Sequence, residues 1–437
     1  MGLKIIYGKA GSGKSTYCFS EISKIINKEK KIFIITPEQF SFTAEKKLME
    51  TIESKAVIYA EVITLSRMAY RVMSEIGGNN EIQLSKCGKA MLIYSILNDC
   101  KKDLKFLGKT DENIDLSIRA ITEFKKHGVG VEDLKQEIDK TEDIYLKNKI
   151  KDMTYIYEKF EEKVQTNYIE ETDLLTILSN NIEKVDLIKN SIIYIDEFAG
   201  FTKQEYEIIR QMLKLAKEVN ITICADNLEQ NTNPDIDIYY PNKITAQKLK
   251  DIAKEENCTI EEIELKNTYR FKTKELKHLS DNLYNIKSTK YAENVENIRL
   301  FLAQSEYSEI EEVAKNIKKI VREKNIKYHD IAIITQDMEK YASLVRAIFN
   351  QYEIPVFIDE KRDLNQNVIV QYVLSIFESL SRNFTSESIF SYIKLGFLDI
   401  DEEEIFKLEN YCNKWGIKQN KWKTDFKYEL DNENKRK

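Results

Sequence analysis

The sequence predicts an α/β fold: a parallel sheet interrupted by a large helical insertion and followed by a second, partial α/β domain. Three observations support this prediction. Short apolar runs alternate with helical patterns over the first 65 residues. A long helical stretch rich in Glu and Lys comes next, and apolar runs then return between residues 190 and 225. Near-continuous apolar strands that alternate with helices are typical of a parallel sheet covered on both faces.

The composition limits the possible classes of protein. A chain of 437 residues is too long for one ordinary core, so we expect two to four domains. The net charge of -6 excludes a global basic field, and any nucleic acid must therefore bind to a local face. The three histidines and six dispersed cysteines lack the spacing of a zinc site or catalytic triad, and we expect reduced thiols in a cytoplasmic protein. No apolar run approaches the roughly 20 residues of a membrane helix.

The predicted elements divide the chain into four parts. Residues 1–65 and 190–290 form the first α/β domain, and residues 66–189 form the helical insertion. Residues 291–365 form the second, partial α/β domain, and residues 366–437 form a truncated helical segment whose last ~15 residues are polar and frayed. The predicted strands of the first domain are Leu3–Tyr7, Lys31–Thr36, Val57–Thr64, Ser191–Ile195 and Asn220–Ala225, with a helix from Lys14 to Asn27. The second domain has predicted strands at Ile298–Ala303, Ile331–Thr335 and Val356–Ile358, with an amphipathic helix over Glu306–Lys324.

A glycine-rich loop between the first strand and the first helix fits the pattern G-x-x-x-x-G-K-[ST]. Glycines let consecutive main-chain N–H groups surround phosphate oxygens, and the helix start adds partial positive charge. Lys14 supplies a charge to the β- and γ-phosphates, and the Ser15 hydroxyl supplies a ligand to Mg²⁺. A chance glycine turn is the alternative, but the strand–loop–helix context favours a P-loop site for ATP and Mg²⁺. The predicted nucleotide-binding residues are Gly8, Lys9, Ala10, Gly11, Ser12, Gly13, Lys14, Ser15 and Thr16.

Two acids follow the apolar strand at Ser191–Ile195. In P-loop proteins an acid at this position holds Mg²⁺, often through water, and an adjacent Glu can orient the attacking water. We therefore assign Asp196 to the metal, together with Ser15, and Glu197 to water activation. A solvated strand end is the alternative interpretation of the pair.

Several segments together resemble superfamily 1 helicases of the UvrD/RecB type. They read GKAGSGKS, TPEQFSFTAE, TLSRMAYRVM, YIDEFAGFTKQE and NTYRF. Within that group the sequence is most similar to the AddB family, the helicase-like subunits of AddAB helicase–nucleases, over roughly residues 1 to 375. The resemblance implies RecA-like domains and a heterodimer with an AddA-type motor. It also implies a role in processing DNA double-strand breaks for recombinational repair.

The resemblance also assigns roles to individual residues. Thr36, Gln39, Phe42 and Thr64 fall in segments that touch single-stranded DNA in such helicases, where an aromatic ring can stack on a base. Packing in the core is the simpler interpretation of Phe42. Arg270 matches a motif whose Arg reaches the γ-phosphate and whose Tyr, here Tyr269, packs near the base.

The sequence also departs from this family. The segment that reads adenine is not found before the loop, and the Gly-Asp-x-x-Gln motif survives only in altered form around Asp226. The arginine finger of the second domain, the nuclease metal site and the four cysteines of the family's iron–sulfur cluster are not found either. We therefore expect an N-terminal portion of a larger subunit, which binds ATP–Mg²⁺ without unwinding DNA alone. The alternatives are a DNA-binding scaffold with a vestigial nucleotide site, or a stand-alone P-loop ATPase whose insertion acts as a lid.

Overall fold

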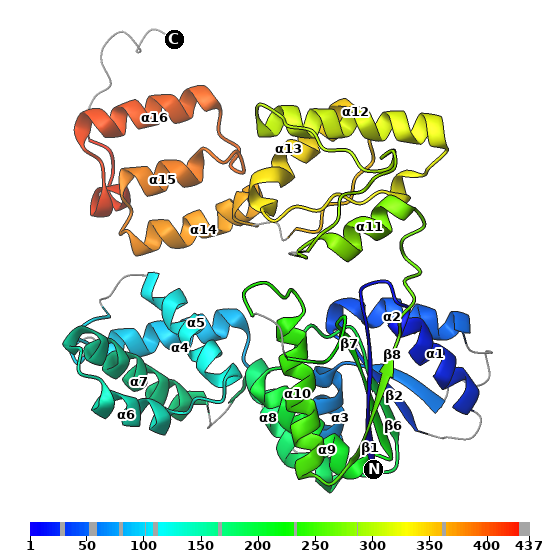
Figure 1. Ribbon diagram of the computed structural model, residues 1–437. Helices are drawn as coiled ribbons and strands as arrows, with labels where there is room; N and C mark the ends of the chain where they lie inside the picture. Colours follow the sequence, from blue (N-terminus) through cyan, green and yellow to red (C-terminus); the bar gives the residue numbers. More distant parts are fainter. Residues whose placement is uncertain are drawn as a thin grey trace. The chain divides into compact units, whose positions relative to one another are not determined.

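A computed structural model describes residues 1–26, 31–51, 59–77, 82–100, 102–107, 112–164, 168–230, 234–285, 287–360 and 364–427 (Figure 1). The chain forms two compact units, Met1–Arg299 and Leu300–Lys437. The polar C-terminal residues that we predict to be frayed lie largely outside the described residues. No helix in the described ranges combines the length and apolar character that crossing a membrane requires.

The described part of the first unit contains a six-stranded, all-parallel sheet, which confirms the predicted α/β fold. The strand order is β3-β2-β6-β7-β1-β8, so that β7 separates the strand of the glycine-rich loop, β1, from the strand of the acidic pair, β6. The strands are β1 (Gly2–Gly8), β2 (Ile32–Ile35), β3 (Ala60–Ile63), β6 (Ile192–Ile195), β7 (Glu218–Cys224) and β8 (Thr259–Glu264).

Helices cover both faces of this sheet because its strands carry apolar side chains on both sides. One core, built on Ile6, Ile34 and Tyr194, packs against helices α1 and α2. The opposite core, built on Ile5, Ile35 and the other strands, packs against α3, α8, α9 and α10. These helices are α1 (Lys14–Ile25), α2 (Glu38–Thr51), α3 (Leu65–Ile76), α8 (Glu171–Asn181), α9 (Lys203–Leu215) and α10 (Tyr240–Glu255).

The helical insertion has a core of its own, centred on Ile93, Ile156 and Phe160. Its helices are α4 (Lys86–Asp99), α5 (Glu112–Lys126), α6 (Val131–Lys140) and α7 (Ile144–Val164) (Figure 1). A short parallel ladder joins β4 (Ile82–Gln83) to β5 (Tyr168–Ile169), and the sequence pattern does not predict it.

Buried charges stabilise the insertion. Glu170 lies 2.5 Å from the ammonium of Lys89 and 2.6 Å from that of Lys125. Lys125 also contacts Glu161 and Asp173. Burial alone would raise the pKa of the Glu170 carboxyl, but the two lysines outweigh it, so the net pKa is lowered. Breaking such a buried network on one side leaves an uncompensated charge.

The second unit confirms the predicted helix over residues 306–324, which is α12 (Glu306–Lys324). It packs against α13 (Met338–Gln351) around Ile310, Ile317 and Phe349. The three strands predicted next to these helices are not formed: their segments carry no ladder pairing in the described residues. Apolar side chains cover only one side of these segments, and Leu302, Ile334 and Phe357 are exposed. The alternating apolar pattern therefore identifies extended chain here, but the hydrogen-bonded pairing that defines a strand is missing.

The remaining described elements are helical. They are α11 (Lys274–Asn282), which belongs to the first unit, and α14 (Val368–Ser381), α15 (Ser386–Ile393) and α16 (Glu402–Trp415). Short 3₁₀ helices are η2 (Ile182–Lys184), η3 (Tyr328–Asp330), η4 (Leu364–Gln366) and η5 (Gln419–Lys423).

Candidate nucleotide-binding site

The glycine-rich loop leaves the carboxyl end of β1 and enters α1 at Lys14. Gly11 and Gly13 have φ angles of +78° and +83°, in the left-handed region that side chains disfavour. A Cβ atom added at Gly11 would lie 2.4 Å from Cβ of Arg270. The backbone N–H of Ser12 donates to the carbonyl of Lys9 at 3.1 Å and curls the loop. The glycines are therefore required both for the turn and for the close approach of another segment.

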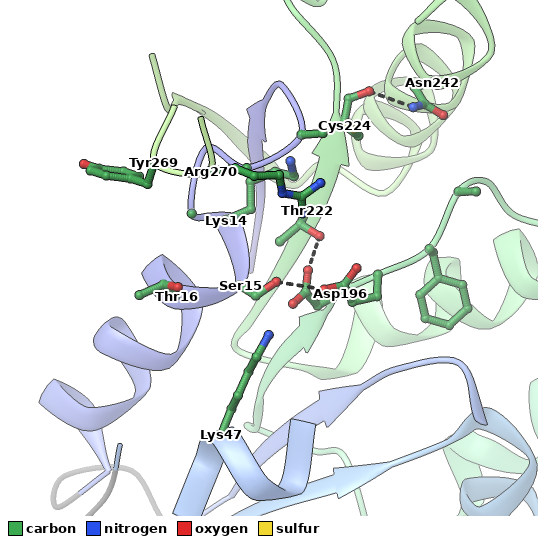
Figure 2. Close-up of a pocket in the computed structure, with 16 residues that line it drawn as sticks. Lys14, Ser15, Thr16, Lys47, Asp196, Thr222, Cys224, Asn242, Tyr269 and Arg270 are labelled. Atoms are coloured by element: carbon green, nitrogen blue, oxygen red, sulfur yellow. Dashed lines mark hydrogen bonds between the residues drawn. The ribbon is translucent and has the colours of Figure 1, made fainter. Parts of the chain in front are cut away.

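The loop forms one wall of a cavity of about 610 Å³ (Figure 2). The ammonium of Lys14 donates to the carbonyl oxygens of Gly8 at 2.9 Å and Lys9 at 3.1 Å, which holds it at the base of the loop. The cavity is lined by Ala10, Gly11, Gly13, Lys14, Ser15, Thr16, Lys47, Asp196, Glu197, Phe198, Ala199, Thr222, Cys224, Asn242, Tyr269 and Arg270. Among the predicted nucleotide-binding residues, Gly8, Lys9 and Ser12 do not line it.

Asp196 lies in the wall opposite the loop, immediately after β6. Its side chain is only 5% exposed, and the Thr222 hydroxyl donates to its Oδ1 at 2.5 Å. The two residues are next to each other because β6 and β7 pair in parallel, with Ile195 opposite Ile221. The strand register thus fixes the direction of the Asp196 carboxylate.

Glu197 has a φ angle of +66°, which is uncommon for a residue other than glycine, asparagine or aspartate. Its carboxylate accepts a hydrogen bond of 3.1 Å from the Ser15 hydroxyl. Backbone strain of this kind persists only where the surrounding structure enforces it, and it often occurs at functional sites. The left-handed turn places Glu197 within reach of the first turn of α1 (Figure 2).

The donor set around Ser15 and Asp196 fits a magnesium ion. Hydroxyl and carboxylate oxygens are ligands that Mg²⁺ accepts, and a nucleotide-bound Mg²⁺ takes its remaining ligands from phosphate and water. In the described ranges, no group of three or more His, Cys, Asp or Glu side chains could hold a metal by itself. The six cysteines are all free, and Cys18 beneath the site is buried. Burial, together with the nearby Asp196, raises the pKa of the Cys18 thiol.

Arg270 reaches the same cavity from a distant part of the chain. The backbone N–H of Tyr269 donates to the carbonyl of Gly11 at 2.8 Å and ties this segment to the loop. In Figure 2 the Arg270 side chain extends across Lys14 toward Thr222, whereas the ring of Tyr269 points away from it. The structure therefore brings together all four residues with predicted chemical roles: Lys14, Asp196, Glu197 and Arg270.

The four predicted DNA contacts do not share one exposed surface. The side chains of Thr36 and Thr64 are buried at the ends of neighbouring strands. The Thr64 hydroxyl caps α3 by accepting from the N–H of Arg67. Gln39 and Phe42 are exposed on α2, and Phe42 is 75% exposed. The interpretation of Phe42 as a core residue is thus wrong: this ring projects from the helix.

Six cavity residues had no place in the sequence-based prediction: Lys47, Phe198, Ala199, Thr222, Cys224 and Asn242. Asn242 donates its side-chain amide to the carbonyl of Cys224 at 2.7 Å and fixes the start of α10 against β7. The sequence offers one signal for Thr222, a polar residue within an apolar strand. It offers none for Lys47, which lies in a helix rich in charged residues.

The altered motif around Asp226 has a structural role. The Lys243 side chain is fully buried, 3.0 Å from Asp226 and 2.7 Å from Asp237. Burial would lower the pKa of Lys243, but its hydrogen bonds to the two carboxylates raise it overall. The carboxylate of Asp226 is therefore engaged by α10, just beyond the cavity wall at Cys224.

The all-parallel sheet, the loop at the end of β1 and the acid at the end of β6 define a RecA-like α/β fold of the P-loop class. The family described as "ADDB, N-terminal" matches residues 5–280 of the sequence. The chain belongs to the AddB family.

Curated relatives agree with this assignment. Three of them carry the name of the B-type subunit of an ATP-dependent helicase/deoxyribonuclease. The protein of Clostridium tetani is 40% identical over 98% of the chain and 39% of its own length. That of Clostridium kluyveri is 38% identical over 97% of the chain and 38% of its length, and that of Caldanaerobacter subterraneus is 39% identical over 99% and 38%. The chain spans less than two fifths of the length of the curated relatives it matches.

Proposed function

We propose that the chain binds ATP–Mg²⁺ between the glycine-rich loop and Asp196, as the helicase-like part of a helicase–nuclease subunit that repairs DNA breaks. One observation carries the proposal: a loop cation, a buried metal-binding acid, a second acid and a distant arginine converge on a single cavity. Lys14 and the loop amides would hold the phosphates, and Ser15 and Asp196 would hold the metal. Glu197 would orient water, and Arg270 would neutralise the terminal phosphate.

The wider role follows from the names of the relatives, which describe one subunit of an ATP-dependent helicase/deoxyribonuclease. We propose that the chain binds DNA and works in the cytoplasm in a heterodimer with an AddA-type motor. Gln39 and Phe42 on α2 are its candidate DNA contacts. In the full-length family we expect an iron–sulfur cluster and a nuclease, whose motifs are not found in this sequence.

The alternative of a DNA-binding scaffold with a vestigial nucleotide site has one supporting observation. The carboxylate of Asp226, in the altered motif, is held by Lys243. A residue bound in this way is poorly placed to relay the state of a nucleotide to DNA.

Calorimetry tests the proposal directly. ATP with Mg²⁺ is titrated into the 437-residue chain, its Lys14→Ala variant and a Lys24→Ala control. Lys24 is on the surface of the same helix and pairs with Glu21 at 2.6 Å. We expect binding by the parent and the control, and at least a ~100-fold loss for Lys14→Ala, since a charged group that binds phosphate contributes about 3 kcal/mol. Absence of binding by the well-folded parent would overturn the proposal. Binding by the parent, with DNA binding and partner-dependent activity unchanged in Lys14→Ala, would favour the scaffold.

A further inference from the structure

A lysine from α2 enters the nucleotide cavity from the side opposite the glycine-rich loop. Lys47 lines the same cavity as Lys14, Asp196 and Arg270. In Figure 2 its side chain rises from α2 and points toward Ser15 and Asp196. None of the phosphate-binding or acidic motifs includes Lys47, and the roles assigned above leave this side chain unexplained.

The buried face of α2 determines the direction of Lys47. Ala44 and Leu48 are buried in the core on the α1 side of the sheet, and they mark the centre of that face. Successive residues turn about 100° around a helix, so Lys47 lies about 80° from this centre, on one flank. By the same geometry Lys46 lies about 180° away and faces solvent.

The neighbours of α2 agree with this geometry. On the other flank, Glu45 pairs with Arg67 of α3 at 3.6 Å. On the solvent side, Lys46 pairs with Glu50 at 3.9 Å. The ammonium of Lys47 has no ion-pair partner among the residues that the structure describes. Adjacent lysines on one helix thus have different surroundings, and only Lys47 faces the cavity.

The charges of the cavity call for a bound anion. Lys14, Lys47 and Arg270 are its cationic side chains, and Asp196 and Glu197 are its carboxylates. A triphosphate remains negatively charged after it binds magnesium, so a third cation in a partly enclosed cavity stabilises it. Lys14 reaches the phosphates from the loop, and Lys47 approaches from the side of the metal-binding acid.

We propose that Lys47 binds the terminal phosphate of a nucleoside triphosphate and so makes the site selective for the triphosphate over the diphosphate. This inference rests on the proposed function, because it requires the nucleotide to lie between the loop and Asp196. The loop amides and Lys14 bind phosphates that both nucleotides share. A contact made only with the terminal phosphate changes the ratio of the two affinities.

The test compares ATP and ADP, each with Mg²⁺, by calorimetry on the full 437-residue chain. The variants are Lys47→Ala, Lys47→Arg and the matched control Lys46→Ala. We expect Lys47→Ala to weaken ATP binding about 10-fold, the size expected for one charge-assisted hydrogen bond, and ADP binding less than twofold. Lys47→Arg should retain most of the selectivity, and Lys46→Ala should match the parent.

The outcomes separate this inference from the proposed function. If the parent binds no ATP, the proposed function fails and Lys47 loses its ligand with it. If the parent binds ATP but Lys47→Ala behaves like Lys46→Ala, only the role of Lys47 is wrong. Equal losses for ATP and ADP would also overturn it, since they would show a general effect on the cavity. Thermal unfolding of each variant, with Lys47→Gln as a second substitution, separates loss of contact from loss of fold.

Discussion

The hydroxyl of Thr222 lies 2.5 Å from Oδ1 of Asp196, on the strand that separates the acid from the glycine-rich loop. The hydrogen bond occupies one oxygen of the carboxylate and fixes its plane. A threonine in the middle strand thereby controls the direction in which a metal-binding acid in the neighbouring strand can point.

Replacing Thr222 with valine should raise the Mg²⁺ concentration needed for ATP binding by about 10-fold. Valine has nearly the same shape but leaves Oδ1 of a buried carboxylate without its donor, which costs about 1–3 kcal/mol. ATP affinity measured across a Mg²⁺ titration checks the prediction. Thr222→Ser keeps the hydroxyl and should behave like the parent; if the valine variant does too, the hydrogen bond does not orient the acid.

Gly11→Ala should weaken ATP binding strongly. The new Cβ would meet Arg270 at 2.4 Å, and the left-handed backbone adds about 1–2 kcal/mol of strain. Relief of the clash requires the segment of Tyr269 and Arg270 to move away from the loop. Gly416→Ala is a suitable control, because its φ angle is +58° and no atom of the described residues lies within 4 Å of the position that its Cβ would take. Nucleotide titrations on both variants should show a loss at Gly11 only.

Glu170→Gln should lower the free energy of unfolding by about 3 kcal/mol at pH 7, because Lys89 and Lys125 lose a buried partner. The pKa of Glu170 is lower in the folded chain than its ordinary value of 4.5. The stabilisation is therefore complete above about pH 4.5 and is lost as the pH falls through the folded-state pKa. Urea unfolding at several pH values should show the difference from the parent shrinking in acid.

A surface pair in the same insertion serves as the control for Glu170. Glu132 pairs with Lys135 at 3.1 Å, and its side chain is largely exposed. Glu132→Gln should change the free energy of unfolding by less than about 1 kcal/mol at any pH. Similar losses for the two substitutions would mean that burial of the Glu170 network contributes little.

Phe42→Ala should reduce the affinity for single-stranded DNA about 10-fold without changing the melting temperature. An exposed ring contributes little to the core, whereas stacking on a base is worth about 1–3 kcal/mol. Fluorescence anisotropy with a labelled oligonucleotide measures the effect. Met49→Ala, another exposed apolar residue of α2, is the control, and equal affinities of the two variants would exclude stacking by Phe42.

The sequence predicted those parts of the site in which a residue type meets a local backbone requirement. The glycines, Lys14 and the Asp196–Glu197 pair belong to short segments whose strand and helix context is visible in the chain. Thr222 was missed because its role depends on the register between two strands that are far from β1 in sequence. Lys47 was missed because its direction follows from the packing of α2, which a single helix cannot reveal.

Strand β8 (Thr259–Glu264) shows the same limit in the fold. Its residues alternate between isoleucine or threonine and glutamate, and most are exposed at the sheet edge. Charged side chains are suited to an edge strand but weaken the apolar pattern by which buried strands are recognised. Conversely, the apolar segments around Ile334 and Phe357 have strand-like sequences but no ladder among the described residues. Pairing depends on neighbouring chain, which the local pattern does not contain.

The position of β7 between β1 and β6 has a mechanical consequence. Neighbouring strands lie about 4.8 Å apart, so the loop and the acid are separated by roughly 10 Å across the sheet rim. A ligand gripped at both ends would act as a strut between strands that do not touch each other. Occupancy should then slow amide hydrogen exchange along all three strands together, and nucleotide binding would be felt as rigidity of the whole sheet.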